Sequence, residues 1–153
     1  MPYLEDVLRL GEIHHEPFPS SKTTGIFLTR GMQLLGTFDD FQRFKRGTDD
    51  YKGWHRHHVF ERQDWSRLNI ETLAPRYEDQ LCVLLPERAH IGRVNSVLRS
   101  QAPQGAILPP RELLKAYEDA YEIVGDYCGG GERLIRRELS GIVRGTLRLC
   151  GQM

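Results

Sequence analysis

The residues best suited to chemistry lie in one stretch, Trp54-His55-Arg56-His57-His58-Val59-Phe60-Glu61, which holds three of the six histidines. Neutral imidazole is the commonest metal ligand and the usual general base near neutral pH. In a strand the side chains alternate, so His55 and His57 would point to one face and His58 to the other. Where a strand twists into a loop, His57 and His58 can still flank one site. A polar loop of solvated histidines is the alternative interpretation.

Two elements that follow this cluster could help to position it. Residues 79–86 form an apolar run that ends in proline, which predicts a strand. Pro86 suits the first turn of a helix, and a helix is predicted over residues 87–100 because its apolar residues recur at helical spacing. His90 lies at the edge of this apolar stripe, directly after the strand. A histidine bonded to a carbonyl at the edge of the core is the alternative for His90.

The remaining pattern predicts an α+β fold in one domain that spans residues 1–153. Its shorter elements are a helix over 3–10, a loop over 14–21, a strand over 25–29, a strand or helix over 31–36, and a helix carrying Phe41 and Phe44 that Asp39 or Asp40 caps. Apolar stripes over 111–124 and 132–150 predict two long helices that pair as a hairpin over 111–150. We therefore expect a small antiparallel sheet with helices at both ends.

Composition narrows the functional classes. The chain has 153 residues, and its 21 basic and 21 acidic side chains give a formal net charge of zero. This balance argues against a basic nucleic-acid coat protein but allows a local basic patch. No apolar run approaches the roughly 20 residues of a membrane span, so no membrane association is expected. The cysteines are odd in number and lack CxxC spacing, which indicates free thiols in a reducing compartment.

In order, residues 53–99 combine a strand ending in His57-His58, a loop, a strand over 80–85 and a helix bearing His90. This arrangement resembles the ββα-metal finger of HNH/endonuclease VII-like nucleases, especially the toxin families whose motif contains a His-His pair. The segments that carry the resemblance are W-H-x-H-H at 54–58 and D-Q-L-x-V-L-L-P-x-x-x-H at 79–90. The resemblance covers the ββα-like core and does not extend to the flanking regions.

The resemblance implies a metal-dependent endonuclease that hydrolyses phosphodiester bonds. It implies that His58 is the general base and that His57 and His90 are ligands of one divalent ion, Zn²⁺, Mg²⁺, Mn²⁺ or Ni²⁺. Such a reaction needs a deprotonated water and a cation that stabilises charge on the phosphate and the leaving oxygen. Arg56, beside the histidine pair, could bind phosphate. His55 is a candidate third ligand or substrate contact.

The chain departs from the family pattern at two positions. Gln80 stands where the family often has an asparagine that orients the catalytic loop; glutamine can form similar hydrogen bonds but is one methylene longer. Many members carry a second helix histidine four residues after the first, and Val94 occupies that position here. Asn95 follows it but lies about 140° around the helix from His90. These departures leave open a weakened metal site, a site with few protein ligands, or an inactive relative.

The resemblance also implies a biological setting. Such domains act in the cytoplasm as bacterial polymorphic or contact-dependent toxins, exported as part of a longer chain and blocked by a cognate immunity protein. Nucleic acid would be the substrate, with DNA favoured over RNA.

Two other functions remain open. A non-enzymatic metal- or protein-binding module, a degenerate nuclease fold, could hold structural zinc through His55, His57 and His90, although structural sites normally have four ligands. A different hydrolase could use the same histidines.

Overall fold

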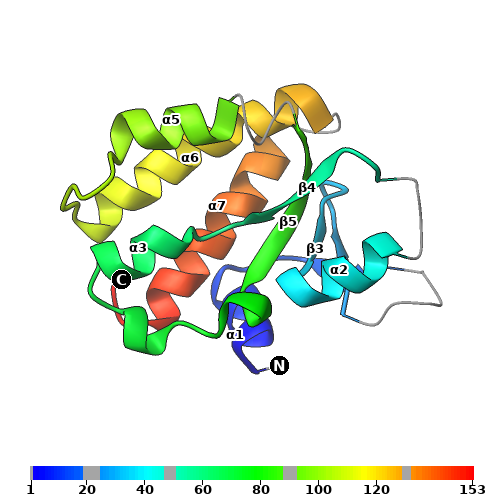
Figure 1. Ribbon diagram of the computed structural model, residues 1–153, viewed down its shortest axis with the longest axis horizontal. Helices are drawn as coiled ribbons and strands as arrows, with labels where there is room; N and C mark the ends of the chain where they lie inside the picture. Colours follow the sequence, from blue (N-terminus) through cyan, green and yellow to red (C-terminus); the bar gives the residue numbers. More distant parts are fainter. Residues whose placement is uncertain (1, 19–24, 47–50, 88–92, 129–131) are drawn as a thin grey trace.

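The computed structural model describes residues 2–18, 25–46, 51–87, 93–128 and 132–153. Within these ranges, one five-stranded antiparallel sheet has the order β1-β2-β3-β5-β4 (Figure 1). Its strands are β1 (His15–Pro17), β2 (Phe27–Thr29), β3 (Leu34–Thr37), β4 (Trp54–His58) and β5 (Leu81–Pro86). The histidine cluster is therefore the end strand of this order, paired on one side with β5. In that register His57 lies opposite Val83 and His58 opposite Cys82.

Strand β5 joins two layers of apolar side chains because it is buried on both faces. Leu81, Val83 and Leu85 belong to the larger core cluster, whereas Cys82 and Leu84 belong to a smaller one on the other face. This alternation follows the two-residue period of a strand. An apolar run without polar alternation is what a strand covered on both faces requires.

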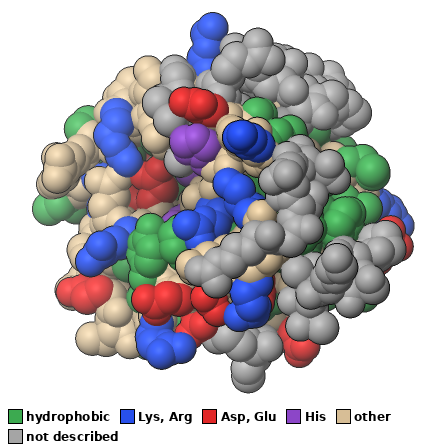
Figure 2. Space-filling view, turned by 45° about the vertical axis from the view of Figure 1, so that its right-hand side comes forward, with side chains coloured by type: hydrophobic (Ala, Val, Ile, Leu, Met, Phe, Trp, Pro, Cys, Tyr) green, Lys and Arg blue, Asp and Glu red, His purple; other side chains and the backbone are tan. Residues whose placement is uncertain are grey.

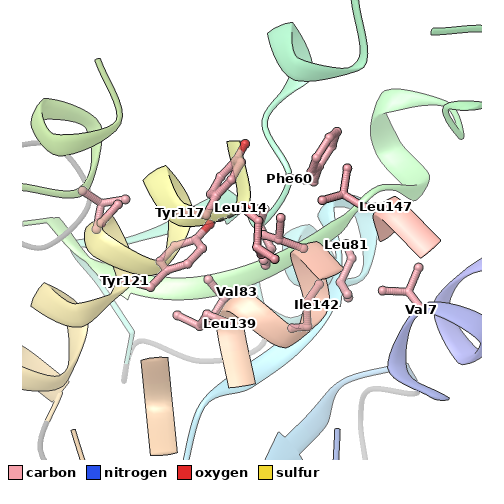
Figure 3. Close-up of a cluster of buried hydrophobic side chains, with 14 of the residues drawn as sticks. Val7, Phe60, Leu81, Val83, Leu114, Tyr117, Tyr121, Leu139, Ile142 and Leu147 are labelled. Atoms are coloured by element: carbon pink, nitrogen blue, oxygen red, sulfur yellow. Dashed lines mark hydrogen bonds between the residues drawn. The ribbon is translucent and has the colours of Figure 1, made fainter. Parts of the chain in front are cut away.

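Helices on one face of the sheet supply most of the larger cluster. They are α1 (Pro2–Leu10), α6 (Pro110–Cys128) and α7 (Glu132–Leu149). Figure 3 shows Tyr117 and Tyr121 of α6 and Leu139 and Ile142 of α7 converging on Val83 of β5. Helix α7 also approaches α1 closely, since a Cβ added at Gly145 would lie 2.3 Å from the Val7 carbonyl oxygen. The glycine thus permits a backbone contact that any side chain would prevent.

The smaller cluster lies beneath α2 (Phe38–Arg46), which contributes Phe41 and Phe44. This helix begins with a reciprocal pair of hydrogen bonds. The Asp40 N–H donates to the Thr37 hydroxyl oxygen at 3.0 Å, and the Thr37 N–H donates to the Asp40 carboxylate at 3.4 Å. Thr37 is therefore the N-cap, and the prediction that Asp39 or Asp40 occupies that position is wrong.

The α+β class, the antiparallel sheet and the C-terminal helical hairpin are confirmed. The order β4, β5, helix is also present, the described helix being α5 (Asn95–Gln101), which lies alongside α6 (Figure 1). One difference is β1, which forms within the predicted loop 14–21 by pairing with β2. Between β4 and β5 lie α3 (Arg62–Arg67) and two short 3-10 helices, η1 (Glu71–Leu73) and η2 (Tyr77–Asp79). Among the described helices, none is both long and apolar enough to span a membrane.

A buried polar network attaches the segment after β4 to α6. The Tyr117 hydroxyl accepts a hydrogen bond from the Glu61 N–H at 2.7 Å and donates one to the Asp64 carboxylate. That carboxylate also accepts from the Arg67 Nε at 2.7 Å, and both side chains of this ion pair are only 3% exposed. Burial raises the pKa of Asp64, and its bonds with Tyr117 and Arg67 oppose this effect. Losing a partner from such a buried group is costly.

We expect Tyr117→Phe to lower the free energy of unfolding by about 1–3 kcal/mol, because the Asp64 carboxylate loses one donor and the Glu61 N–H loses its acceptor. Urea denaturation followed by circular dichroism measures the change. Tyr77→Phe is the matched control, since Tyr77 is 41% exposed and its hydroxyl should contribute far less. Equal unfolding free energies for Tyr117→Phe and the wild type would contradict the role given to this network.

Candidate functional site

An open groove of about 680 Å³ lies at the end of β4, and Arg56, His57 and His58 all border it. Glu61, which precedes α3, residues of α3, η2 and α5, and Gln104 complete its walls; those with charged or aromatic side chains are Glu61, Arg62, Tyr77 and Arg99. The strand is regular through His58, so the two adjacent histidines leave it in opposite directions, yet both reach this groove. The structure therefore brings together three of the residues that the sequence singled out.

Helix α6 orients the side chain of His57. Its side chain is buried, and its Nε2 lies 2.9 Å from the Tyr121 hydroxyl. That hydroxyl donates its single proton to the Val59 carbonyl at 2.6 Å. The hydrogen-bond pattern therefore assigns a donating proton to His57 Nε2. Tyr121 thus contributes to the orientation of the His57 ring by accepting this hydrogen bond.

His58 is held between two aromatic rings. Its ring stacks on Phe38, with centroids 5.2 Å apart, and contacts Tyr77, with centroids 4.4 Å apart. Its Nε2 lies 3.3 Å from the Tyr77 carbonyl oxygen, which can only accept, so Nε2 carries a proton and Nδ1 the lone pair. Burial lowers the pKa of His58, and the charge of Arg56 lowers it further, against the opposing effects of the Tyr77 carbonyl and Glu61. A neutral, oriented imidazole of this kind can accept a proton.

The groove is locally cationic although the chain as a whole has no net formal charge. Among the described residues at its border, Arg56, Arg62 and Arg99 outnumber the single carboxylate, that of Glu61. The Arg56 guanidinium lies 3.7 Å from the centroid of Phe38 and donates to the Phe38 carbonyl at 3.2 Å. Arg99 pairs with Glu61 at 2.6 Å across the groove. Such clustering favours an anionic ligand such as phosphate.

The other predicted site residues lie elsewhere. Gln80 is buried, and its Nε2 donates to the Pro75 carbonyl at 3.0 Å, so it holds the segment that carries Tyr77; it is not among the residues that border the groove. Its Oε1 is buried without a hydrogen-bond partner in the described part of the chain. His55 borders a second hollow of about 360 Å³, together with Lys45 and Arg56.

The predicted metal site is only partly covered by the described ranges. His90, the predicted second ligand, lies outside them. Within the ranges that the structure describes, no group of three His, Cys, Asp or Glu side chains is arranged to hold a metal ion. Among the described residues that border the groove, the His, Cys, Asp and Glu side chains that could donate to a metal are His57, His58 and Glu61.

Sequence reasoning missed several residues that shape the groove. Arg62 directly follows the histidine-rich stretch, and Arg99 lies four residues after Asn95, a spacing that puts both on one face of a helix. The position of Arg62 beside the histidines and the spacing of Arg99 from Asn95 could have identified both arginines from the sequence. Tyr121 had no such signal, because it falls within the apolar stripe of its helix and was interpreted as core. Figure 2 shows Lys and Arg side chains, together with some Asp and Glu side chains, around a histidine on one face of the molecule.

Together, the fold and the groove define an α+β protein with a cationic groove that contains two oriented imidazoles. Comparison of the chain with protein-family models, with curated proteins and with solved structures finds no match. The chemical capacity of the groove follows from its own groups, which can bind an anion and accept a proton.

We expect Tyr121→Phe to release the His57 tautomer while the protein stays folded, because the ring remains and only the hydroxyl is lost. Side-chain ¹⁵N NMR of the histidines measures the tautomer: the wild type should show His57 protonated at Nε2, and the variant a shift towards a mixture. Tyr117→Phe, one helical turn away and bonded to Glu61 and Asp64, should leave the His57 signals unchanged. An unaltered His57 tautomer in Tyr121→Phe would refute the assignment.

Proposed function

We propose that this protein is a nuclease that hydrolyses phosphodiester bonds in nucleic acid, with the groove at the end of β4 as its active site. The observation that carries the proposal is the position of His58, a histidine of lowered pKa whose Nε2 is bonded to a carbonyl, in a groove bordered by three arginines. The sequence resemblance of residues 53–99 to His-His nucleases supports the same assignment independently of the geometry.

In this mechanism the protein groups have separate roles. His58 accepts the proton of the attacking water at Nδ1, while its Nε2–H bond to the Tyr77 carbonyl keeps the ring in place. Arg56 and Arg62 bind the non-bridging oxygens of the scissile phosphate and offset the charge that develops there. Gln80 supports the segment that carries Tyr77, and so acts as a positioning residue.

A divalent ion, Zn²⁺, Mg²⁺, Mn²⁺ or Ni²⁺, belongs to the proposal through the resemblance. His57, with His90 and His55 as the further candidates, would hold it. The ion would supply charge stabilisation at the phosphate and at the leaving oxygen.

The proposal extends to the biological role that the resemblance implies. DNA is the proposed substrate ahead of RNA, and the protein is proposed to be the toxin domain of a bacterial effector that acts in the cytoplasm of its target. An immunity protein that covers the cationic groove would be its natural inhibitor.

Metal-stripped protein supplied separately with Mg²⁺, Mn²⁺, Ni²⁺ or Zn²⁺ should cleave plasmid DNA with at least one ion. In His58→Ala, the cleavage rate should fall about 10²- to 10⁴-fold, the usual contribution of a general base. His14→Ala is the matched control, because His14 is exposed and borders a different hollow, and it should cleave at the wild-type rate. No cleavage of DNA or total RNA by folded wild type with any ion would refute the nuclease proposal and favour a binding module.

Arg62→Gln should weaken nucleic-acid binding about equally for all sequences and reduce the slope of log affinity against log salt by about one, since one phosphate contact is lost. Fluorescence anisotropy at a series of salt concentrations measures both effects. Arg111→Gln is the control: Arg111 is also exposed but lies at the start of α6, outside the groove lining. If the two variants gave the same salt slope as the wild type, Arg62 would not contact phosphate.

A further inference from the structure

The groove contains an aromatic surface that hydrolysis alone does not require. Tyr77 borders the groove and is 41% exposed, although large aromatic side chains are usually well covered. We propose that Tyr77 is a stacking site for an unpaired nucleobase, so that the groove binds single-stranded nucleic acid. This inference rests on the proposed function for the class of ligand.

The Tyr77 ring is held in place from within the protein. It contacts the ring of His58, with centroids 4.4 Å apart, and that of Phe38, with centroids 4.8 Å apart. Its backbone is fixed as well, because its carbonyl accepts the His58 Nε2–H and Gln80 holds Pro75 two residues before it. A rigid, exposed ring loses little conformational entropy on binding, which suits it to stacking.

Arginines accompany both aromatic rings but at different distances. The Arg56 guanidinium lies directly on Phe38, 3.7 Å from the ring centroid. The Arg62 guanidinium is 5.8 Å from the centroid of Tyr77, at the outer limit of a cation–π contact, and its side chain is exposed. Arg62 can therefore move to the phosphate next to a base that stacks on Tyr77. A cationic side chain beside an exposed aromatic ring is a combination typical of grooves that bind single strands.

The same surface discriminates against a continuous duplex. In a duplex both faces of each base are covered by neighbouring bases, so a protein ring can stack only on a base that has left the helix, at a cost of a few kcal/mol. An unpaired strand offers its base faces without that cost. The exposed Tyr77 ring therefore adds affinity for a single strand and none for an intact duplex, which would gain only from the arginines.

The test compares binding of three ligands by fluorescence anisotropy in EDTA, with strand integrity checked on a gel. The ligands are a single-stranded oligodeoxynucleotide, the same strand with abasic sites, and the corresponding duplex. Tyr77→Leu removes the ring, Tyr77→Phe keeps it, and Leu73→Ala is the matched control, because Leu73 is 56% exposed but does not border the groove. Circular dichroism establishes that each variant is folded.

We expect Tyr77→Leu to weaken binding of the base-containing strand about tenfold and to change binding of the abasic strand and the duplex less than twofold. Tyr77→Phe and Leu73→Ala should bind all three ligands as the wild type does. Equal weakening for the base-containing and abasic strands would overturn the proposal, as would wild-type binding that is no tighter for the base-containing strand. The comparison does not depend on cleavage, so an inactive protein would refute the nuclease proposal while the difference between the strands still decides this one.

Discussion

Two tyrosine hydroxyls on one helix determine the shape of the groove. Tyr117 and Tyr121 of α6 are fully buried. Their hydroxyls form hydrogen bonds with the backbone just after β4, Tyr117 with the Glu61 N–H and Tyr121 with the Val59 carbonyl. The same hydroxyls bond Asp64 and His57, so the helix sets both the path of the chain and the orientation of one groove histidine. Without these two hydroxyls, the Val59 carbonyl and the Glu61 N–H that follow β4 would lose these hydrogen bonds beside an apolar core, which is costly.

In this arrangement the buried clusters support the fold, and different side chains border the groove. The larger core cluster provides the rigid support on one face of β4, and the smaller cluster beneath α2 provides it on the other through Phe38, which stacks with both Arg56 and His58. The groove lies where the two layers meet at the end of the sheet. Side chains positioned by rigid neighbours are the ones that can hold a reactive geometry without rearrangement.

Much of the fold could be predicted because its signals are local. The apolar run of β5 and the stripes of α6 and α7 follow from residue spacing alone. The N-cap at Thr37 could not be separated from Asp39 and Asp40 by composition, since all three residue types cap helices. Strand β1 depends on its partner β2, which a local pattern does not reveal.

The residues of the groove were also partly predictable, because some of them are neighbours in the sequence. Arg56, His57 and His58 are neighbours in sequence, and they border one groove. The partner of Glu61, by contrast, is Arg99, which is 38 residues away, and the partner of His57 is Tyr121, which is 64 residues away. Contacts between residues so far apart in the sequence come from the packing of helices on the sheet, so local residue spacing does not predict them.

The ion pair between Arg99 and Glu61 has a consequence for selectivity. Because the carboxylate already offsets much of this arginine's charge, an incoming anion gains less from Arg99, and its full gain requires displacing Glu61, which exchanges one ion pair for another. A small monovalent anion therefore has little net advantage there. A ligand with several linked charges can engage Arg56 and Arg62 at the same time and offset the exchange. Under the proposed function, this ion pair would therefore favour polyanions over simple anions and acidic side chains.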